Sequence, residues 1–224
     1  MRLSIVIPLL NERTQLPRLL EHLQPLRKRP DCEIILVDGG SEDGSAELAA
    51  AAGFRVLSAP RGRGIQMNAG AAAAVGETLL FLHADTRLPD AAPQRVASAL
   101  AQGADWGRFD LQIGGDSFWF PLISALINWR SCLTGIATGD QAIFVRRTLF
   151  EQLGGFPPQP VMEDIEFSKR LRRHQRPACV RDRVVTSGRR WQRYGVARTV
   201  LLMWRLRFAY WRGVPAEVLA RHYE

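Results

Sequence analysis

Four short, largely apolar runs near the N-terminus place the strongest constraint on the fold. The runs cover residues 3–8, 33–38, 55–58 and 78–82, and the segments between them, 14–27, 45–52 and 65–75, carry helical patterns. Runs of this length with few charges are typical of strands buried on both faces. Their alternation with helices over the first 85 or so residues is the rhythm of a parallel sheet. The sequence therefore predicts an α/β domain. Pro8, which cannot donate a hydrogen bond in a central ladder, is expected to stop the first strand, and Asn11 is a candidate cap of the first helix.

The fourth run ends at His83-Ala84-Asp85, a pair of potential metal ligands. The second run ends in the same way, at Asp38. In open α/β sheets ligands bind at the carboxyl ends of the strands, so these acids are candidates for a binding site. The alternative is structural, because Asp85 or Thr86 could cap a helix that begins near Pro89.

The second half of the chain predicts a mixed continuation of the domain. Expected helices cover residues 90–102, 118–129 and 163–173, and expected strands cover 106–113, 142–146 and 179–186. The acidic pair Glu163-Asp164 opens the last of these helices, and Arg189-Arg190-Trp191 follows the last strand.

Charge is concentrated at the C-terminal end. The chain has 224 residues and a net charge of +8, and from Arg172 onward thirteen arginines stand against three acids. Such a basic segment predicts a polyanionic neighbour: nucleic acid, phosphate groups or an anionic membrane surface.

The cysteines and the hydropathy pattern narrow the class of protein. Cys32, Cys132 and Cys179 lie far apart without a C-x-x-C pair, which predicts reduced, buried thiols rather than a zinc site or a disulfide framework. The chain enters a strand at once, so no signal peptide is expected. The longest uncharged apolar stretch, residues 117–129, is too short to cross a membrane. The sequence also lacks G-x-G-x-x-G and G-x-x-x-x-G-K-[ST], which disfavours a dinucleotide-dependent dehydrogenase and a P-loop NTPase.

Taken together, the motifs resemble the inverting glycosyltransferases of family 2, which have the GT-A fold. The resemblance is carried by residues 5–12, 37–45, 68–70, 82–85, 139–141 and 162–164 in that order. It implies a mostly parallel sheet flanked by helices. The expected organisation is a GT-A domain over 1–191, with a nucleotide-sugar half (1–110) and an acceptor half (111–191), and a basic amphipathic helical tail over 192–224.

For the donor, the resemblance implies a nucleotide-diphosphate sugar, with a uridine nucleotide as the default, and a divalent cation, Mn²⁺ or Mg²⁺. Asp85 matches the metal-binding acid of the family's DxD signature, while His83 replaces the first Asp of that signature. Gly39 also departs from the pattern, because most relatives carry a second acid there. The residues expected to bind the nucleotide-sugar are Pro8, Glu12, Asp38, Asn68, His83, Asp85 and Arg190.

For catalysis, the resemblance implies that Asp164 is the base that takes the proton of the acceptor hydroxyl, with Glu163 beside it. On the acceptor side it implies Asp140, Gln141 and Trp191. Structural alternatives stay open: the acidic pair also favours a helix start, and Trp191 could be a core residue.

The tail predicts a basic amphipathic helix. Arg198, Arg205 and Arg212 are seven residues apart and share a helical face, and the remaining surface is rich in Leu, Met, Trp and Phe. Such a helix suits an anionic membrane surface, a lipid-like acceptor and a location in the cytoplasm at the inner face of the cell membrane. The alternative is a helix packed on the catalytic domain or on a dimer partner.

Three other functions remain open at this point. A nucleotidyltransferase has a similar sheet, but its G-x-G-x-R loop is absent after the first strand. A nucleic-acid binder would explain the basic tail, although it does not require acids at several strand ends. A non-catalytic nucleotide-sugar-binding protein would explain the departures at His83 and Gly39.

Overall fold

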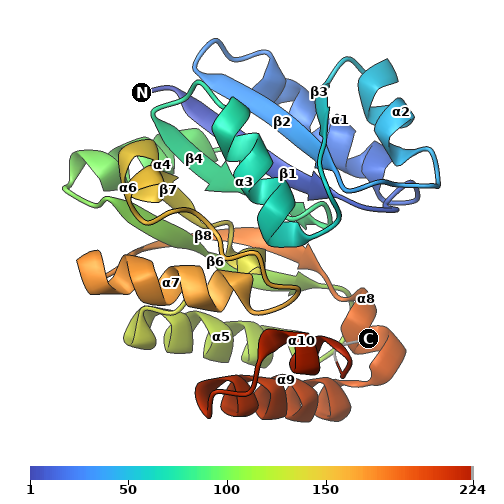
Figure 1. Ribbon diagram of the computed structural model, residues 1–224, viewed down its shortest axis with the longest axis vertical. Helices are drawn as coiled ribbons and strands as arrows, with labels where there is room; N and C mark the ends of the chain where they lie inside the picture. Colours follow the sequence, from blue (N-terminus) through green and yellow to red (C-terminus); the bar gives the residue numbers. More distant parts are fainter. Residues whose placement is uncertain (223–224) are drawn as a thin grey trace.

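The computed structural model describes residues 1–222, whose strands form one mixed sheet (Figure 1). The strand order is β3-β2-β1-β4-β7-β6-β8-β5. The strands are β1 (Leu3–Leu9), β2 (Cys32–Asp38), β3 (Arg55–Ser58), β4 (Thr78–Phe81), β5 (Thr86–Arg87), β6 (Trp106–Gly114), β7 (Phe144–Arg146) and β8 (Ala178–Ser187). Strands β3, β2, β1 and β4 run parallel, as the sequence predicted, and β7 enters antiparallel to both β4 and β6.

Helices cover both faces of the sheet. They are α1 (Leu16–Arg27), α2 (Ser45–Ala51), α3 (Arg63–Ala73), α4 (Ala92–Ala101), α5 (Phe120–Thr134), α6 (Arg147–Gln152), α7 (Glu163–His174), α8 (Arg189–Tyr194), α9 (Val196–Trp211) and α10 (Ala216–Ala220), with a 3₁₀ turn, η1 (Gly139–Gln141). Buried side chains of α1, α2, α4 and α5 share one core, and those of α3, α6 and α7 share the other.

The alternation of side chains in β1 explains these two cores. Leu3, Ile5, Ile7 and Leu9 point into the first core and Val6 points into the second, and all of them are fully buried. Burial on both faces requires the nearly continuous apolar pattern that identified this strand in the sequence.

Two local expectations at the end of β1 are wrong. Pro8 does not stop the strand, because β4 ends at Phe81 and the last β1–β4 pair is Val6 with Phe81, so no neighbour there requires the missing N–H. Asn11 does not cap α1: its side-chain oxygen accepts a hydrogen bond from the Glu42 backbone N–H, and its own φ is 52°. The alternative role of Asp85 or Thr86 as a helix cap is also not observed, since Thr86 begins β5 and α4 has no side-chain cap.

The expectation of three reduced cysteines is corrected as well. Cys132 on α5 and Cys179 on β8 form a disulfide, with their Cα atoms 6.0 Å apart, and Cys32 is a buried free thiol. The two partners are 47 residues apart. Their proximity depends on α5 packing beside β8, which their spacing in the sequence does not reveal.

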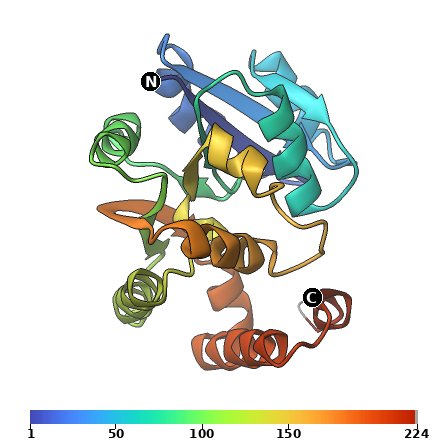
Figure 2. The same cartoon turned by 60° about the vertical axis from the view of Figure 1, so that its left-hand side comes forward.

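The tail forms helices that pack on the domain. Leu206 of α9 joins a small core with Met162 and Ile165 at the start of α7 and with Leu219 of α10. Figures 1 and 2 show α9 and α10 at the end of the molecule opposite β2 and β3. Within residues 1–222, no helix combines the length and hydropathy needed to span a membrane. The last two residues of the expected tail, 223–224, lie outside the described residues.

Candidate active site

Three parallel strands end side by side at one edge of the sheet. Strand β1 lies between β2 and β4, so the segments that follow Leu9, Asp38 and Phe81 meet there. This arrangement brings together the motif residues that follow the strands, as the pattern of strand-end acids predicted.

Arg189, at the start of α8, links two of these strand ends. Its Nη2 atom lies 3.2 Å from Oε2 of Glu12 and 4.0 Å from Oδ2 of Asp85. Burial raises the pKa of Glu12, and the nearby carboxylate of Asp85 acts in the same direction, whereas Arg189 lowers it. The sequence named Arg190 for the donor site and left the choice between Arg189 and Arg190 open. In the structure Arg189 is the one that contacts Glu12 and Asp85. Arg190 instead lies over the ring of Tyr194, 5.9 Å from its centroid.

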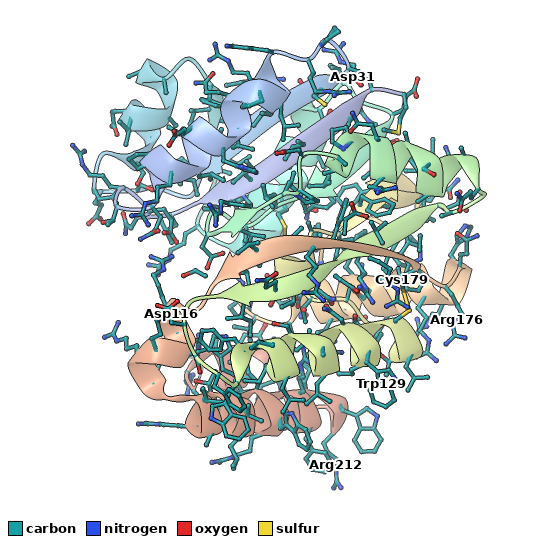
Figure 3. The ribbon with its side chains drawn as sticks, turned by 180° about the vertical axis from the view of Figure 1, so that it is seen from behind. Asp31, Asp116, Trp129, Arg176, Cys179 and Arg212 are labelled. Atoms are coloured by element: carbon teal, nitrogen blue, oxygen red, sulfur yellow. A yellow bond between two sulfur atoms is a disulfide. The ribbon has the colours of Figure 1, made fainter. Side chains whose placement is uncertain are left out.

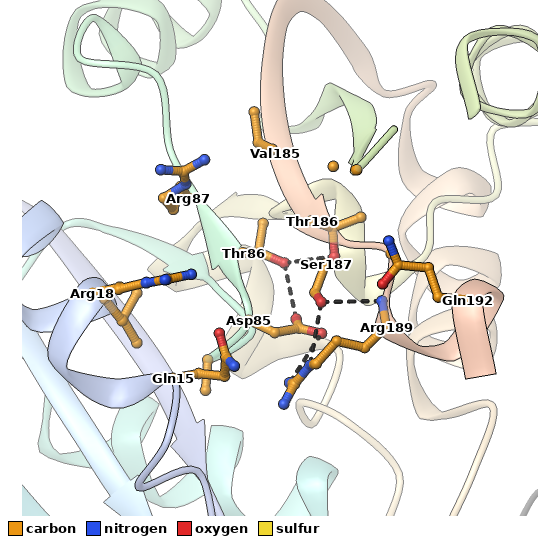
Figure 4. Close-up of a pocket in the computed structure, with 15 residues that line it drawn as sticks. Gln15, Arg18, Asp85, Thr86, Arg87, Val185, Thr186, Ser187, Arg189 and Gln192 are labelled. Carbon is orange, nitrogen blue, oxygen red and sulfur yellow. Dashed lines mark hydrogen bonds and ion pairs between the residues drawn. The ribbon is translucent and has the colours of Figure 1, made fainter. Parts of the chain in front are cut away.

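A cavity of about 280 Å³ opens beside Asp85 (Figure 4). Arg189 is held in its wall because its Nε donates to the hydroxyl of Ser187 at 3.2 Å. The Thr86 hydroxyl donates to Oδ1 of Asp85, also at 3.2 Å. Arg18 and Arg87 line the same cavity, so its lining contains three arginines and one carboxylate. Such a lining favours an anion with several oxygen atoms.

Asp38 lies at the end of β2 with its carboxylate turned into the following loop. The side chain is 6% exposed and accepts hydrogen bonds from the backbone N–H groups of Gly40 and Ser41. The glycine at position 39 has a steric reason, since a Cβ there would lie 2.9 Å from the side chain of Gln66. Gln66 is buried and its amide donates to the carbonyls of Leu9 and Val37. It thereby ties β1 to β2 at the site.

The side chain of Asn68 is engaged in hydrogen bonds with the backbone of Phe156. Its amide donates to the Phe156 carbonyl at 2.8 Å and its oxygen accepts from the Phe156 N–H at 2.9 Å. The two bonds fasten α3 to the loop before α7. The expected contact of Asn68 with the donor is therefore not supported by the direction of its side chain.

His83 is packed against η1. A Cβ on Gly139 would lie 2.3 Å from the His83 Nε2 atom, so only glycine fits at that position. The Nε2 atom is buried and has no hydrogen-bond partner within residues 1–222. Burial, together with the positive charge of Arg63, lowers the pKa of His83 to about 3, so the ring is neutral.

The acidic pair at the start of α7 lies on the other side of the site. Oδ2 of Asp164 accepts a hydrogen bond of 2.7 Å from the Gly139 N–H. Glu163 is 2% exposed and lies 3.6 Å from Arg63. Burial and the charge of Asp164 raise the pKa of Glu163 to about 7, with Arg63 acting in the opposite direction. The structure therefore separates an accessible carboxylate from a buried one within a single dipeptide.

The expected acceptor-side residues divide into three environments. Asp140 is half-buried, burial raises its pKa, and no hydrogen bond reaches its Oδ1 atom from the described residues. Gln141 is fully buried and donates to Ser131 of α5, so it holds η1 in place and is not open to an acceptor. Trp191 is partly buried against the main core, which matches the structural alternative for this residue.

Backbone strain adjoins the site. In the described chain, the non-glycine residues with positive φ are Asn11, Ala142 and Met162, with angles of 52°, 47° and 64°. Asn11 precedes Glu12, Ala142 follows Gln141, and Met162 precedes Glu163. Such conformations cost on the order of 1–3 kcal/mol each and cluster at functional sites. Their positions support the view that this edge of the sheet is a functional site.

A divalent cation fits this site only with help from a substrate. No three His, Cys, Asp or Glu side chains form a metal-binding group among residues 1–222. Asp85 is the one strand-end carboxylate that lines the cavity, and its side chain is 32% exposed. Mg²⁺ and similar ions are often held by one or two carboxylates together with substrate phosphates and water. Asp85 would be the protein ligand of such an ion, whereas the buried Nε2 atom of His83 faces Gly139.

The comparisons with known proteins identify the family. The model of "Glycosyl transferase family 2" matches residues 4–154, more than half of the chain. The chain belongs to glycosyl transferase family 2. Similar curated proteins include the undecaprenyl-phosphate 4-deoxy-4-formamido-L-arabinose transferases of Pseudomonas savastanoi pv. phaseolicola (33% identical; 64% of this chain, 46% of the relative) and Pseudomonas aeruginosa (35% identical; 64% and 45%). The chain thus spans about half the length of these relatives.

Solved structures confirm the GT-A fold. Staphylococcus aureus TarS 1-349 in complex with UDP-GlcNAc has a TM-score of 0.65 at 18% identity, over 84% of this chain and 58% of TarS. Mycobacterium tuberculosis glucosyl-3-phosphoglycerate synthase, in complex with Mn²⁺, UDP and glucosyl-3-phosphoglycerate, has a TM-score of 0.60 at 23% identity, over 81% and 70%. At these identities the likeness concerns the fold. The predicted fold class and family are therefore both correct.

Proposed function

We propose that this protein transfers a sugar, with inversion, from a nucleotide-diphosphate donor to an acceptor hydroxyl. The donor is taken to be a uridine-diphosphate sugar, because the TarS and synthase structures that share this fold were solved with UDP or UDP-GlcNAc. The observation that carries the proposal is the position of Arg189. It contacts Glu12, which lies 177 residues earlier in the sequence, and Asp85, and it lines a cavity at the carboxyl ends of the strands.

On the donor side, the protein's task is to hold a diphosphate and to stabilise it as it leaves. Arg189 would bind diphosphate oxygens with its guanidinium group, which can donate two hydrogen bonds at once. Asp85 would hold a Mn²⁺ or Mg²⁺ ion, which supplies positive charge to the leaving group. Pro8, Glu12 and Asp38 surround the edge where the nucleoside would lie.

On the acceptor side, Asp164 would act as the base. The acceptor oxygen forms a bond to the anomeric carbon as the bond from that carbon to the diphosphate oxygen breaks, and the acceptor proton passes to the Asp164 carboxylate. A single displacement of this kind inverts the anomeric centre. The Gly139 N–H fixes the orientation of that carboxylate. Glu163 would position the pair from its buried site beside Arg63.

For the acceptor we propose a lipid-like or lipid-linked molecule. The curated relatives are named for transfer to undecaprenyl phosphate. This chain offers cationic groups near Asp164. Burial and the charge of Arg207 lower the pKa of Arg130 to about 10, whereas Asp140 and Asp164 act in the opposite direction. The Nε and Nη2 atoms of Arg130 are buried without a hydrogen-bond partner among residues 1–222. Arg130 and Arg207 are candidates for contact with an acidic acceptor. Peripheral contact of residues 196–212 with the inner face of the cell membrane is part of the same proposal.

A panel of nucleotide-sugars tests the function. Each donor is mixed with the protein with and without Mn²⁺, and thermal stabilisation and release of nucleoside diphosphate are measured. One uridine-diphosphate sugar should raise the melting temperature in the presence of Mn²⁺ and undergo slow hydrolysis. Stabilisation without any turnover, even with lipid-phosphate acceptors, would favour a non-catalytic nucleotide-sugar-binding protein. Absence of stabilisation by every donor would refute the proposal.

A further inference from the structure

Helix α5 exposes an apolar face that no other segment of residues 1–222 covers. Trp119, Leu122, Leu126, Trp129 and Leu133 follow one another at intervals of three or four residues, and each has between 52% and 64% of its surface exposed. That spacing places them along one side of the helix. The preceding residue Phe118 is 87% exposed. The opposite side of α5 packs into the main core through Phe120 and Ile123.

Helix α9 exposes a second apolar face of the same kind. Leu201, Trp204, Phe208 and Trp211 again lie three or four residues apart, with exposures of 63%, 74%, 59% and 73%. The buried side of α9 packs on the start of α7 through Leu206. The helix is therefore anchored to the domain by one side and presents aromatic rings on the other.

Both helices lie at the same end of the molecule. Figures 1 and 3 show α5 and α9 together at the end away from β2 and β3, and Figure 3 shows Trp129 and Arg212 projecting there. Arg130 of α5 and Arg207 of α9 are close enough for each to influence the other's charge. The two helices thus lie at one end of the molecule, and we call their exposed residues the α5–α9 surface.

The charge of the α5–α9 surface is of one sign. Neither helix contains an Asp or a Glu. Exposed arginines stand among or beside the apolar residues, namely Arg176, Arg198, Arg205 and Arg212. A surface that combines exposed tryptophans with arginines and lacks acids complements an anionic lipid headgroup layer. A second copy of the chain is disfavoured, because a symmetric contact would bring arginines together with no acid on either helix to pair with them.

We propose that α5 and α9 together form a docking surface for an anionic bilayer. The apolar rings enter the headgroup region and the arginines pair with lipid phosphates. This inference rests on the proposed function for the contact through residues 196–212 and adds α5, which the sequence presented only as an apolar helix. Docking by two helices fixes the orientation of the domain relative to the bilayer.

The test measures binding to vesicles, so that it does not depend on sugar transfer. Vesicles of phosphatidylglycerol mixed with phosphatidylcholine are titrated with the wild-type protein and with two double variants, Leu126→Ser/Trp129→Ser on α5 and Trp204→Ser/Trp211→Ser on α9. Each double variant should weaken binding about tenfold or more. The control Val75→Ser, which changes an exposed apolar residue outside the two helices, should bind like the wild type. Vesicles of phosphatidylcholine alone should bind more weakly.

Two results would overturn the proposal. If the α5 variant binds vesicles with wild-type affinity, α5 takes no part in docking and only the tail does. The second result has two parts: the wild type forms a dimer in light scattering that both variants lose, and the wild type does not bind vesicles. That result would assign the surface to a protein interface. Melting temperatures confirm that the variants fold. Donor hydrolysis, measured in the same preparations, reports on the proposed function separately, since neither variant alters the cavity or the acidic pair.

Discussion

Two groups of carboxylates face the same site in contrasting environments. Asp85 and Glu12 lie at strand ends and share the guanidinium of Arg189, and the Asp85 side chain is about one third exposed. Glu163 and Asp164 begin a helix, and Glu163 is almost fully buried, with its pKa raised to about 7. Pairs of acids whose environments separate their titration are a common basis for dividing roles in a site. The strand-end pair would suit charge binding, and the pair at the start of α7, which combines a buried and a half-buried carboxylate, would suit proton transfer.

The largest expected effect comes from the acidic pair at the start of α7. Asp164→Asn removes the proposed base while preserving the shape of the side chain and one of its backbone hydrogen bonds. The rate of transfer should fall about a thousandfold. The matched control is Glu166→Gln on the same helix, which should retain most of the activity. Transfer by Asp164→Asn at a rate near that of the wild type would exclude this residue as the base.

The next effect distinguishes the two arginines after β8. Arg189→Ala removes the guanidinium that faces Glu12 and Asp85, and it should weaken UDP binding roughly 10- to 100-fold. Arg190→Ala should change UDP affinity by less than about threefold, because Arg190 lies over Tyr194. Equilibrium titration with UDP measures both. Equal losses in the two variants would contradict the assignment of Arg189.

A smaller effect is expected on stability. The pKa of Glu163 in the folded protein is raised above its usual value of 4.5 to about 7. Ionised Glu163 therefore lowers the free energy of unfolding once the pH exceeds the pKa of this group in the unfolded chain. The full loss of stability is present above about pH 7. Glu163→Gln should therefore raise the melting temperature by several degrees at pH 8 and by little at pH 5. The control Glu151→Gln, at an exposed position, should show no such pH dependence. An equal change in melting temperature at pH 5 and pH 8 would show that ionisation of Glu163 does not destabilise the folded protein.

The N-terminal half of the fold could be predicted because β1, β2 and β4 are buried on both faces, while the partly exposed edge strand β3 is a short run set between two helices. Strand β3 was predicted with the correct bounds, and β1, β2 and β4 to within one residue at each end. The positions of Asp38 at the end of the second strand and of Asp85 after the fourth strand followed directly from these bounds. The predicted end of β1 at Pro8 was wrong because it depends on the length of the neighbouring strand β4, which the sequence of β1 does not reveal.

The sequence was less informative about side chains that depend on packing between distant segments. The choice between Arg189 and Arg190 depends on how α8 leaves β8. Asn68 and Gln141 match family positions, yet they point into hydrogen bonds with Phe156 and Ser131. Gln66 gave no motif signal, and the close approach of its side chain to Gly39 is visible only in the structure. The Cys132–Cys179 disulfide and the exposed face of α5 likewise required the tertiary structure.

The division between the two acidic groups is tested most directly by calorimetric titration of UDP with Mn²⁺ into three proteins: the wild type, Asp85→Ala and Asp164→Asn. The account predicts that Asp164→Asn binds with wild-type affinity, whereas Asp85→Ala loses the Mn²⁺-dependent part of the binding. Unchanged affinity in Asp85→Ala, or a loss confined to Asp164→Asn, would contradict it.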